Sequence, residues 1–531
     1  MKLHTPICTL LLAVTLTAVP AAAAQSAYVP LDDVAYVYLD ALIARGELRG
    51  LSVLERPYTV GLIRAAMAAD SRWITRTRQR RTRSSRGTAV SDRTAELRSR
   101  LERAIGKYDF ARRGRAPVRA ELSASLWATG ETSSQRELML ANDNSGAFAG
   151  GAARFLIGAG PVVGFSRPIL ENRLNTDPDF RGRTDRRIAG RLEDGYVSGQ
   201  WRFGELFFGR TARNWGPAPL QGLLLSSAPF TYDHLFGRLG NQRVNISLLL
   251  ARLDDDSTAT NERIQRHVAT HRLSVRWRAI EAAIAESFVY TGVGRGFEPT
   301  LANPFSIYAL TWRNEKPEGN LLLSGQLAAR TRLGIFSGEL LLDDIQIDRC
   351  DTLCEQPSSY GLTLTAEGVP FAFGQRAFAS YTRVSALTYR NKNDADRYTA
   401  FDVSMGRGFS DYDEFRMGAD VVALGVPLRP YFAHRRQGEG DYRVPFPPPA
   451  EYATQPGIFE GEVTRISRVA VSGGAVFGSL DVRGDVGYNS VDRSDAFTPP
   501  PGADFRPVES GFEGRVRVSW NPRWARIRFA P

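Results

Sequence analysis

The stretch PVRAELSASLWA, residues 117–128, decides the fold. Along it apolar side chains such as Val118 and Leu122 alternate with polar ones such as Arg119 and Glu121. Successive side chains of a β-strand point to opposite faces, so this period of two predicts a strand with one apolar and one polar face. Before residue 117 the apolar period is close to that of a helix, so the chain changes character at this point.

The same alternation recurs along the rest of the chain, in residues 243–250, 272–277, 362–366, 480–483 and 515–520. Runs of about ten residues are long enough to cross a bilayer at a tilt. A soluble sandwich would also alternate, but the pattern extends over too many strands for an ordinary single sandwich. It predicts an all-β transmembrane barrel of about eighteen antiparallel strands, within a range of roughly 16 to 20.

Aromatic side chains near the ends of these runs also favour an outer-membrane barrel, because such barrels carry aromatic girdles at both membrane surfaces. The candidate girdle residues are Trp127, Trp201, Trp277, Tyr290, Trp312, Tyr389, Trp520 and Trp524. The last run ends at Phe529 and resembles the C-terminal insertion signal of outer-membrane proteins, although Ala530 and Pro531 follow it. Long polar linkers between the runs are expected to be surface loops.

The chain of 531 residues begins with a predicted signal peptide, residues 1–24. Lys2 precedes an apolar run at residues 7–19, and Ala22, Ala23 and Ala24 offer a cleavage site of small residues. An apolar run of this length is too short to span a bilayer and is typical of an export signal. We therefore expect cleavage near Ala24 and localisation in the outer membrane of a Gram-negative bacterium.

Residues 25–116 are predicted to form a small, basic, helical unit on the periplasmic side of the barrel, residues 117–531. Helices are expected at residues 34–43, with Asp32 or Asp33 as the cap, at 60–69, with Thr59 as the cap, and at 92–107. Arginines crowd residues 71–90, which we expect to be a solvated loop, or else a contact with an anionic surface. Helices this short must pack on something larger.

The net charge of +11 comes from arginine, since the only lysines are Lys2, Lys107, Lys316 and Lys392. For an exported protein the available anions are lipid phosphates, lipopolysaccharide and acidic polysaccharide, and not nucleic acid. Arginine suits phosphate and carboxylate groups well. Genomic base composition is an equal explanation for the arginine excess.

The sequence offers few candidate residues for a disulfide, a metal site or catalysis. Cys350 and Cys354 are expected to form a disulfide in an oxidising compartment, or to remain free thiols. His267 and His271 lie on a predicted strand, where four residues span roughly 13 Å, too far for one metal ion. The acidic run at residues 254–256 is expected to be solvated and not a calcium loop. We expect no cofactor and no enzyme activity; His234 is the one candidate base for a hydrolase.

The interval between two predicted strands, residues 209–238, combines glycine, proline, tryptophan and arginine without helical periodicity, which predicts a shaped loop. Aromatic rings stack on sugars, while arginine and aspartate bind hydroxyl and carboxylate groups. The candidate carbohydrate-binding residues are Arg210, Arg213, Asn214, Trp215, Tyr232, Asp233 and Arg238. The alternative is that Trp215 and Phe230 fill the barrel mouth and that the arginines hydrogen-bond to backbone carbonyl groups.

Two stretches of this loop, Trp215-Gly216-Pro217 and Leu223-Leu224-Leu225-Ser226, together with the helical unit from Tyr28 to Met67, resemble the Wzi family of capsule-assembly proteins. The resemblance implies an 18-stranded outer-membrane barrel with a periplasmic helical bundle. It also implies a non-enzymatic, lectin-like role in holding capsular or extracellular polysaccharide at the cell surface. We expect a monomer. The alternative is a porin-like channel whose helical unit resembles an S-layer-homology module.

Overall fold

The computed structural model describes residues 26–80, 88–110, 118–141, 145–258, 260–315, 319–344, 358–446, 459–492, 509–522 and 526–529. The predicted signal peptide and the predicted disulfide between Cys350 and Cys354 lie outside the described residues. Both remain predictions.

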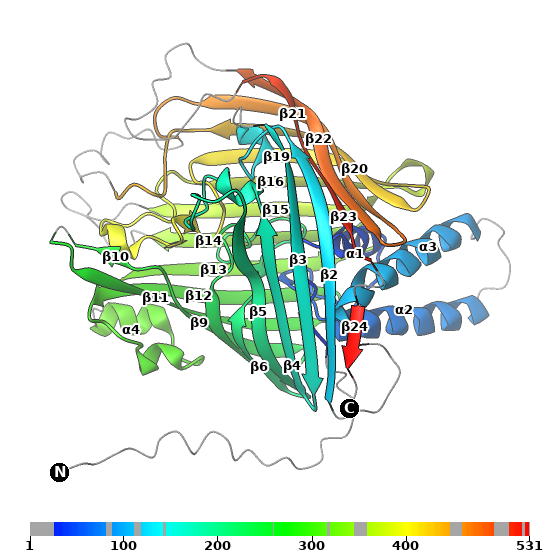
Figure 1. Ribbon diagram of the computed structural model, residues 1–531, viewed down its shortest axis with the longest axis horizontal. Coiled ribbons are helices and arrows are strands. Elements are labelled where there is room, and N and C mark those ends of the chain that lie inside the picture. Colours follow the sequence, from blue (N-terminus) through cyan, green and yellow to red (C-terminus); the bar gives the residue numbers. More distant parts are fainter. Residues whose placement is uncertain are drawn as a thin grey trace.

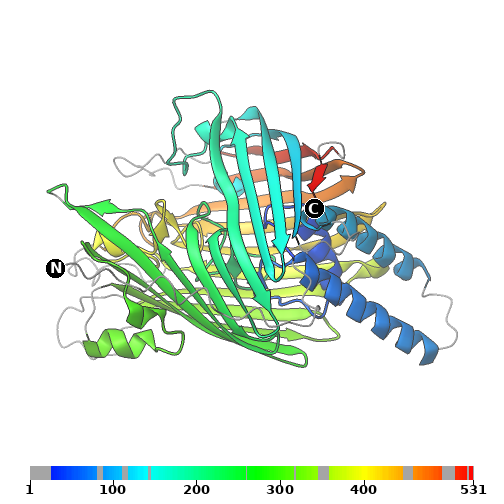
Figure 2. The same cartoon turned by 60° about the horizontal axis from the view of Figure 1, so that its bottom comes forward.

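A single antiparallel sheet makes up most of the described chain and closes into a barrel (Figures 1 and 2). Closure occurs at β2, which pairs with β3 on one side and with β23 and β24 on the other. The strands are β2 (Val118–Glu131), β3 (Gly146–Ala159), β4 (Val162–Glu171), β5 (Ala189–Trp201), β6 (Gly204–Arg210), β8 (Asp233–Gly240), β9 (Val244–Arg252), β10 (Asp256–Ser257), β11 (Arg263–Trp277), β12 (Ile280–Val293), β13 (Asn320–Arg330), β14 (Ile335–Asp344), β15 (Ser359–Pro370), β16 (Arg376–Val384), β19 (Tyr412–Ala423), β20 (Val426–Gln437), β21 (Thr464–Phe477), β22 (Leu480–Asp492), β23 (Gly511–Trp520) and β24 (Arg526–Phe529).

Two of these strands share a position in the barrel wall with the strand that precedes them. β10 follows β9 along β11, and β24 follows β23 along β2. Within the described residues, the 20 strands of the sheet therefore occupy eighteen positions around the barrel. The prediction of a closed antiparallel barrel with about eighteen strands is confirmed.

The two ends of the barrel differ. One end carries short hairpin turns, such as residues 160–161, 202–203 and 424–425, and the other carries long connections, such as residues 211–232 and 385–411. The helices α1 (Ala35–Ala44), α2 (Val60–Arg80) and α3 (Thr88–Ile105) lie at the end with the short turns, at the right of Figure 1. In bacterial outer-membrane barrels the short turns face the periplasm and the long loops face outward.

Side chains alternate between the two faces of the wall as the sequence predicts. On β6, Leu206 and Phe208 are 52% and 66% exposed on the outside, whereas Glu205 and Phe207 are buried inside. Charged groups of other strands, such as Arg272 and Glu339, are also buried within the barrel. The outer face is thus apolar and the inner face carries the charges.

The predicted aromatic girdle is partly wrong. Trp201, Trp277 and Trp520 are exposed near the short turns. Trp127 instead points inward, where its Nε1 donates a hydrogen bond of 3.1 Å to Glu171. Because side chains alternate along a strand, Trp127 lies on the same face as Glu121 and Ser125, which are also odd-numbered. The inward direction of Trp127 could therefore be predicted from the sequence. Tyr389 lies buried in a loop, and Tyr290 is covered by the chain that follows β12.

Within the residues that the structure describes, three α-helices precede the barrel: α1 (Ala35–Ala44), α2 (Val60–Arg80) and α3 (Thr88–Ile105). Thr59 caps α2 as predicted, because its hydroxyl accepts a 3.3 Å hydrogen bond from the N–H of Leu62. The expected loop at residues 71–90 is wrong over residues 71–80, where α2 continues, and over residues 88–90, where α3 begins. Among the described residues, no helix has the length and hydropathy required to cross a membrane.

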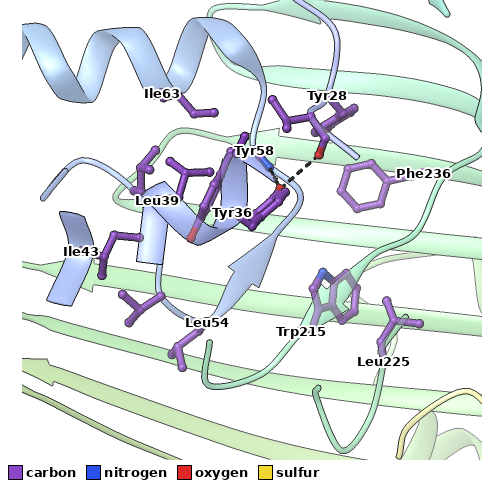
Figure 3. Packing of buried hydrophobic residues seen from close by; sticks show 14 of the residues in the cluster. Tyr28, Tyr36, Leu39, Ile43, Leu54, Tyr58, Ile63, Trp215, Leu225 and Phe236 are labelled. Atoms are coloured by element: carbon purple, nitrogen blue, oxygen red, sulfur yellow. Dashed lines mark hydrogen bonds between the residues drawn. The ribbon is translucent and has the colours of Figure 1, made fainter. Parts of the chain in front are cut away.

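The N-terminal segment enters the barrel and joins its core. Tyr36, Leu39, Leu54 and Tyr58 belong to one buried cluster with loop and strand residues, including Trp215, Leu225 and Phe236 (Figure 3). A separate two-stranded sheet inside the barrel ties the two parts together: β1 (Glu55–Arg56) pairs with β7 (Asn214–Trp215). The prediction that the short helices pack on something larger is confirmed.

Candidate functional site

The loop between β6 and β8, residues 211–232, folds into the barrel against the N-terminal segment. The N–H of Gly216 donates to Leu54 O at 3.0 Å, and that of Ala218 donates to Val53 O at 2.9 Å. The chain then turns back on itself, so that the N–H of Trp215 donates to Leu225 O at 2.8 Å. A side chain at Gly222 would lie 1.9 Å from Trp215 O, so only glycine fits this close approach. The loop is shaped, as the sequence predicts.

Trp215 and Asn214 lie in the interior of this loop. Trp215 is fully buried, with the guanidinium of Arg272 5.6 Å from its ring. The Asn214 side chain donates to Leu220 O at 3.0 Å and accepts from the N–H of Gly222 at 2.8 Å. Both side chains hold the loop in shape, and in this structure Trp215 presents no ring face to solvent.

The remaining predicted contact residues are divided between the two faces of the barrel wall. Arg210 and Asp233 face outward at the same register position, and the Arg210 Nε donates to Asp233 Oδ1 at 2.9 Å. Arg213 and Arg238 face inward. The Arg238 guanidinium pairs with Glu55 of β1, and Arg213 lies 3.7 Å from the ring centre of Phe236. The structure therefore does not bring the seven predicted residues into one accessible site.

Both ring nitrogens of His234 are occupied. Arg213 Nε donates to His234 Nε2 at 2.9 Å, so that nitrogen is the acceptor. His234 Nδ1 then carries the hydrogen and donates to Tyr232 O at 3.0 Å. A general base needs a free ring nitrogen within reach of a nucleophile, so this arrangement gives no support to a hydrolase centred on His234.

A buried carboxylate that the sequence analysis missed holds the leucine-rich part of the loop. Glu339 of β14 accepts hydrogen bonds from the backbone N–H groups of Leu223 at 2.9 Å and Leu224 at 3.4 Å. The side chain of Gln326 donates to it as well, at 3.0 Å. Its position in an alternating strand marks Glu339 as inward-facing, but no local signal pairs it with a loop more than a hundred residues away.

Near the long-loop end, Phe230 and two arginines form an aromatic and cationic cluster. The guanidinium carbons of Arg136 and Arg191 each lie 4.0 Å from the ring centre of Phe230. Phe180, from the loop between β4 and β5, packs edge-on against Phe230 at 5.8 Å. Phe230 also lines a small pocket, together with Arg213, Tyr232 and His234.

Charge pairs extend this cluster across neighbouring loops. Arg181 pairs with Asp402 at 2.9 Å, and Arg443 pairs with Asp179 at 3.3 Å. The Arg181 side chain is 56% exposed. We call Arg136, Phe180, Arg181, Arg191, Phe230 and Arg443 the mouth surface. The sequence marks residues 170–191 as a charged loop but contains no sign of which other loops it meets.

Asp411 ties the loop after β20 to the loop before β19. Its Oδ2 accepts hydrogen bonds from the N–H groups of Gly440 at 2.9 Å and Glu460 at 3.0 Å. Burial raises the pKa of Asp411 to about 6, against the opposing effect of these two hydrogen bonds. This carboxylate therefore titrates near neutral pH in a loop at the mouth.

Two aspartates of the acidic run at residues 254–256 form ion pairs with arginines. Asp255 pairs with Arg252 and Arg263, and Asp254 pairs with Arg266 at 3.4 Å. In the part of the chain that the structure describes, no group of three or more histidine, cysteine or acidic side chains is placed to hold a metal ion.

The closed antiparallel barrel with an apolar outer face, short turns at one end and long loops at the other is the architecture of Gram-negative outer-membrane barrels. In this chain a helical N-terminal segment and an inward-folded loop share its core. No protein-family model matches the sequence, and no curated protein matches it.

Among solved structures the fold is similar to that of Wzi, an Escherichia coli outer-membrane protein involved in group 1 capsule assembly and described as a carbohydrate-binding β-barrel. The TM-score is 0.57 at 12% identity, over 93% of this chain and 99% of Wzi. OccD1 (OprD) is also similar, with a TM-score of 0.43 at 11% identity over 77% of this chain and 96% of its own. A BenF-like porin from Pseudomonas fluorescens has a TM-score of 0.42 at 8% identity, over 77% of this chain and 98% of its own. At these identities the likeness concerns the fold, and it confirms the Wzi-type architecture that the loop motifs predicted.

Proposed function

We propose that this protein is a non-catalytic, monomeric outer-membrane barrel that binds acidic capsular or extracellular polysaccharide at the cell surface. The mouth surface is the observation that carries the proposal. Its arginines match the carboxylate or phosphate groups of an acidic glycan, and Phe180 offers aromatic surface beside them, while Phe230 lies between Arg136 and Arg191. Wzi, whose fold is similar, is described as carbohydrate binding.

Of the residues predicted from the sequence, we propose two roles. Arg210, Tyr232 and Asp233 retain exposed surface near the mouth and are candidates for glycan contact. Arg213, Asn214, Trp215 and Arg238 are buried or paired within the wall and loop, and act by holding the loop that supports Phe230. Lipopolysaccharide and lipid are expected partners of the outer wall.

The orientation follows the general rule for bacterial barrels. With the long loops outward, α1, α2 and α3 lie on the periplasmic side, and residues 1–24 serve as a signal peptide cleaved near Ala24. In this arrangement the mouth surface faces the medium, where exported polysaccharide is present.

A channel is the competing function, and the filled interior argues against it. The core cluster runs without a break from α1 through β1 and β7 to the strands of the wall. Purified protein in planar bilayers is expected to give no stable ion-conducting steps and to be retained on a column bearing acidic polysaccharide. Stable conductance without retention would favour the porin-like alternative.

The cellular test compares bound and shed polysaccharide in strains with and without the gene. Loss of the protein is expected to move acidic polysaccharide from the cell-bound fraction to the medium without changing the total. An unchanged distribution would contradict the proposal. A fall in the total amount would point to a role in export.

A further inference from the structure

Residues 294–311, between β12 and β13, fold back over the outside of the barrel wall. This segment contains a short 3₁₀ helix, Pro299–Ala302, and the start of α4 (Tyr308–Glu315). Figure 1 shows α4 beside the strands β11 and β12. We call residues 294–311 the outer flap.

The flap covers a polar pair on the outer face of the wall. Thr270 and Arg272 face the interior, where Thr270 meets Ser287 and Arg272 meets Glu55. Strand alternation therefore places His271 outside, together with its register partner Glu286. Their side chains lie 2.9 Å apart, from His271 Nε2 to Glu286 Oε2.

This pair sits within the height of the membrane-facing belt. His271 lies seven residues from the Arg278 turn, which is roughly 23 Å along the strand, or about 18 Å above the short-turn end at a typical tilt. The apolar belt of such a barrel is about 25 Å tall. Leu273 and Ile284, just below the pair on the same face, are 41% and 64% exposed, as lipid-facing side chains are.

The flap closes over the pair by direct contacts. The Tyr308 ring centre lies 4.2 Å from that of His271, and the N–H of Tyr308 donates to Glu286 Oε2 at 2.7 Å. The Tyr308 hydroxyl donates to Leu301 O at 2.6 Å, which holds the flap on itself. The pair is consequently only 12% and 15% exposed.

A separate hydrophobic cluster fixes the flap to the wall. Leu301 and Tyr308 of the flap pack on outward-facing strand residues, distinct from the core inside the barrel. These strand residues are Leu250, Ala269, Phe288 and Tyr290. The flap is therefore a packed element of the outer surface.

The opposite side of the flap is strongly apolar. Phe297, Phe305, Ile307 and Leu310 are 52%, 71%, 53% and 58% exposed. Exposed apolar patches of this kind mark interaction sites, and this one continues the belt formed by Leu273 and Ile284. A water-facing loop would not be expected to present such a face, whereas hydrocarbon would cover it favourably.

From this geometry we propose that the outer flap is embedded in the outer leaflet, where Phe297, Phe305, Ile307 and Leu310 contact lipid acyl chains. The flap shields the His271–Glu286 pair from hydrocarbon and extends the lipid-facing surface of the barrel. This inference depends on membrane insertion and not on polysaccharide binding.

Lipid-phase labelling of the full, unmodified chain tests the proposal. A hydrophobic carbene-generating probe is photolysed in proteoliposomes, and tryptic peptides are analysed by mass spectrometry. Cleavage after Arg295 and Arg313 isolates residues 296–313, and cleavage after Arg397 and Arg407 isolates residues 398–407 from a buried loop. Labelling of 296–313 is expected to exceed that of 398–407 at least fivefold. Equal labelling in protein shown to be inserted would overturn the proposal, because a flap facing water or a partner protein would not meet the probe.

A second measurement uses a fluorophore. An environment-sensitive dye is attached at Phe305→Cys, with Asp185→Cys in an exposed loop as the matched control, both in a Cys350→Ser, Cys354→Ser background. Lipids with spin-labelled acyl chains are expected to quench the dye at position 305 several-fold more than at position 185. Equal quenching would contradict acyl-chain contact even if polysaccharide binding is normal.

Discussion

Glu55 faces Trp215 across the two-stranded sheet inside the barrel, and its carboxylate pairs with two arginines of the wall, Arg238 and Arg272. One residue of the N-terminal segment thus links the inward-folded loop to two separate strands. Arg272 is 1% exposed, so the pair is screened little by solvent.

Glu55→Gln is expected to lower the free energy of unfolding by about 3 kcal/mol, because it removes the Glu55 counter-charge from the buried guanidinium of Arg272 and the partly exposed one of Arg238. The measurement is urea unfolding of detergent-solubilised protein, followed by the shift of the folded band in electrophoresis. Glu262→Gln, at an exposed position without an ion pair among the described residues, is the matched control. Equal stability of the two variants would refute the structural role of Glu55.

Substitutions of Trp215 test whether this residue positions the loop or contacts the glycan directly. Trp215→Ala is expected to cost about 3–5 kcal/mol, since it opens a cavity in the core. Trp215→Phe fills most of that space, so it is expected to retain polysaccharide binding within about twofold. A large loss of binding in a stably folded Trp215→Phe protein would instead assign ring stacking to Trp215. The exposed Trp277→Ala serves as the stability control.

Arg181→Gln tests the mouth surface at an exposed position, where the substitution is expected to leave the free energy of unfolding nearly unchanged. Removing one cation from an anion-binding surface is expected to weaken acidic polysaccharide binding about two- to tenfold, or up to ~1.4 kcal/mol. The effect is expected to shrink at high salt. Affinity is measured by retention or titration at two ionic strengths. Arg243→Gln, exposed at the short-turn end, is expected to leave binding unchanged.

The pH dependence of the mouth loops follows from Asp411. Its folded pKa of about 6 lies above the ordinary value of 3.8, so its contribution to stability is complete below 3.8 and is lost as pH rises through 6. We expect the amides of Gly440 and Glu460 to exchange hydrogen more readily at pH 7.5 than at pH 5, after correction for intrinsic rates. Between pH 5 and pH 7.5 this amounts to about 1.4 kcal/mol of local stability, because roughly one pKa unit separates pH 5 from the folded pKa.

Asp411→Asn keeps the acceptor oxygen and removes the titration, so the pH dependence of local stability is expected to disappear. Asparagine also tolerates the left-handed backbone found here, with φ of 55°. Asp185→Asn, in an exposed loop, is expected to behave as wild type. A variant at position 411 that keeps the full pH dependence would show that another group is responsible.

The N-terminal segment is expected to act as a plug. Deletion of residues 25–116 removes part of the core cluster that fills the barrel, so cells carrying the truncated protein should become more permeable to small antibiotics. Insertion of the truncated barrel is verified by its folded electrophoretic band. Unchanged permeability with an inserted barrel would contradict the plug.

The sequence by itself determined the elements that depend on local patterns. Alternation in residues 117–128 and its repeats predicted strands, and their number and length predicted a barrel, because a period of two is a property of neighbouring residues. Thr59 as a helix cap was predictable for the same reason, since its hydrogen bond to Leu62 spans three residues. The inward position of Trp127 was available from its parity with Glu121 and Ser125.

Only the tertiary structure decided which residues lie together. Glu55 meets Trp215, Glu339 meets Leu223, and Phe230 lies between Arg136 and Arg191, although large stretches of chain separate most of these partners. Closure of the barrel sets the loop positions and places Arg210 outside the wall and Arg213 inside it. Side-chain alternation gives each strand two faces, but the identity of the groups that each face meets depends on contacts between residues distant in sequence, which no local pattern records.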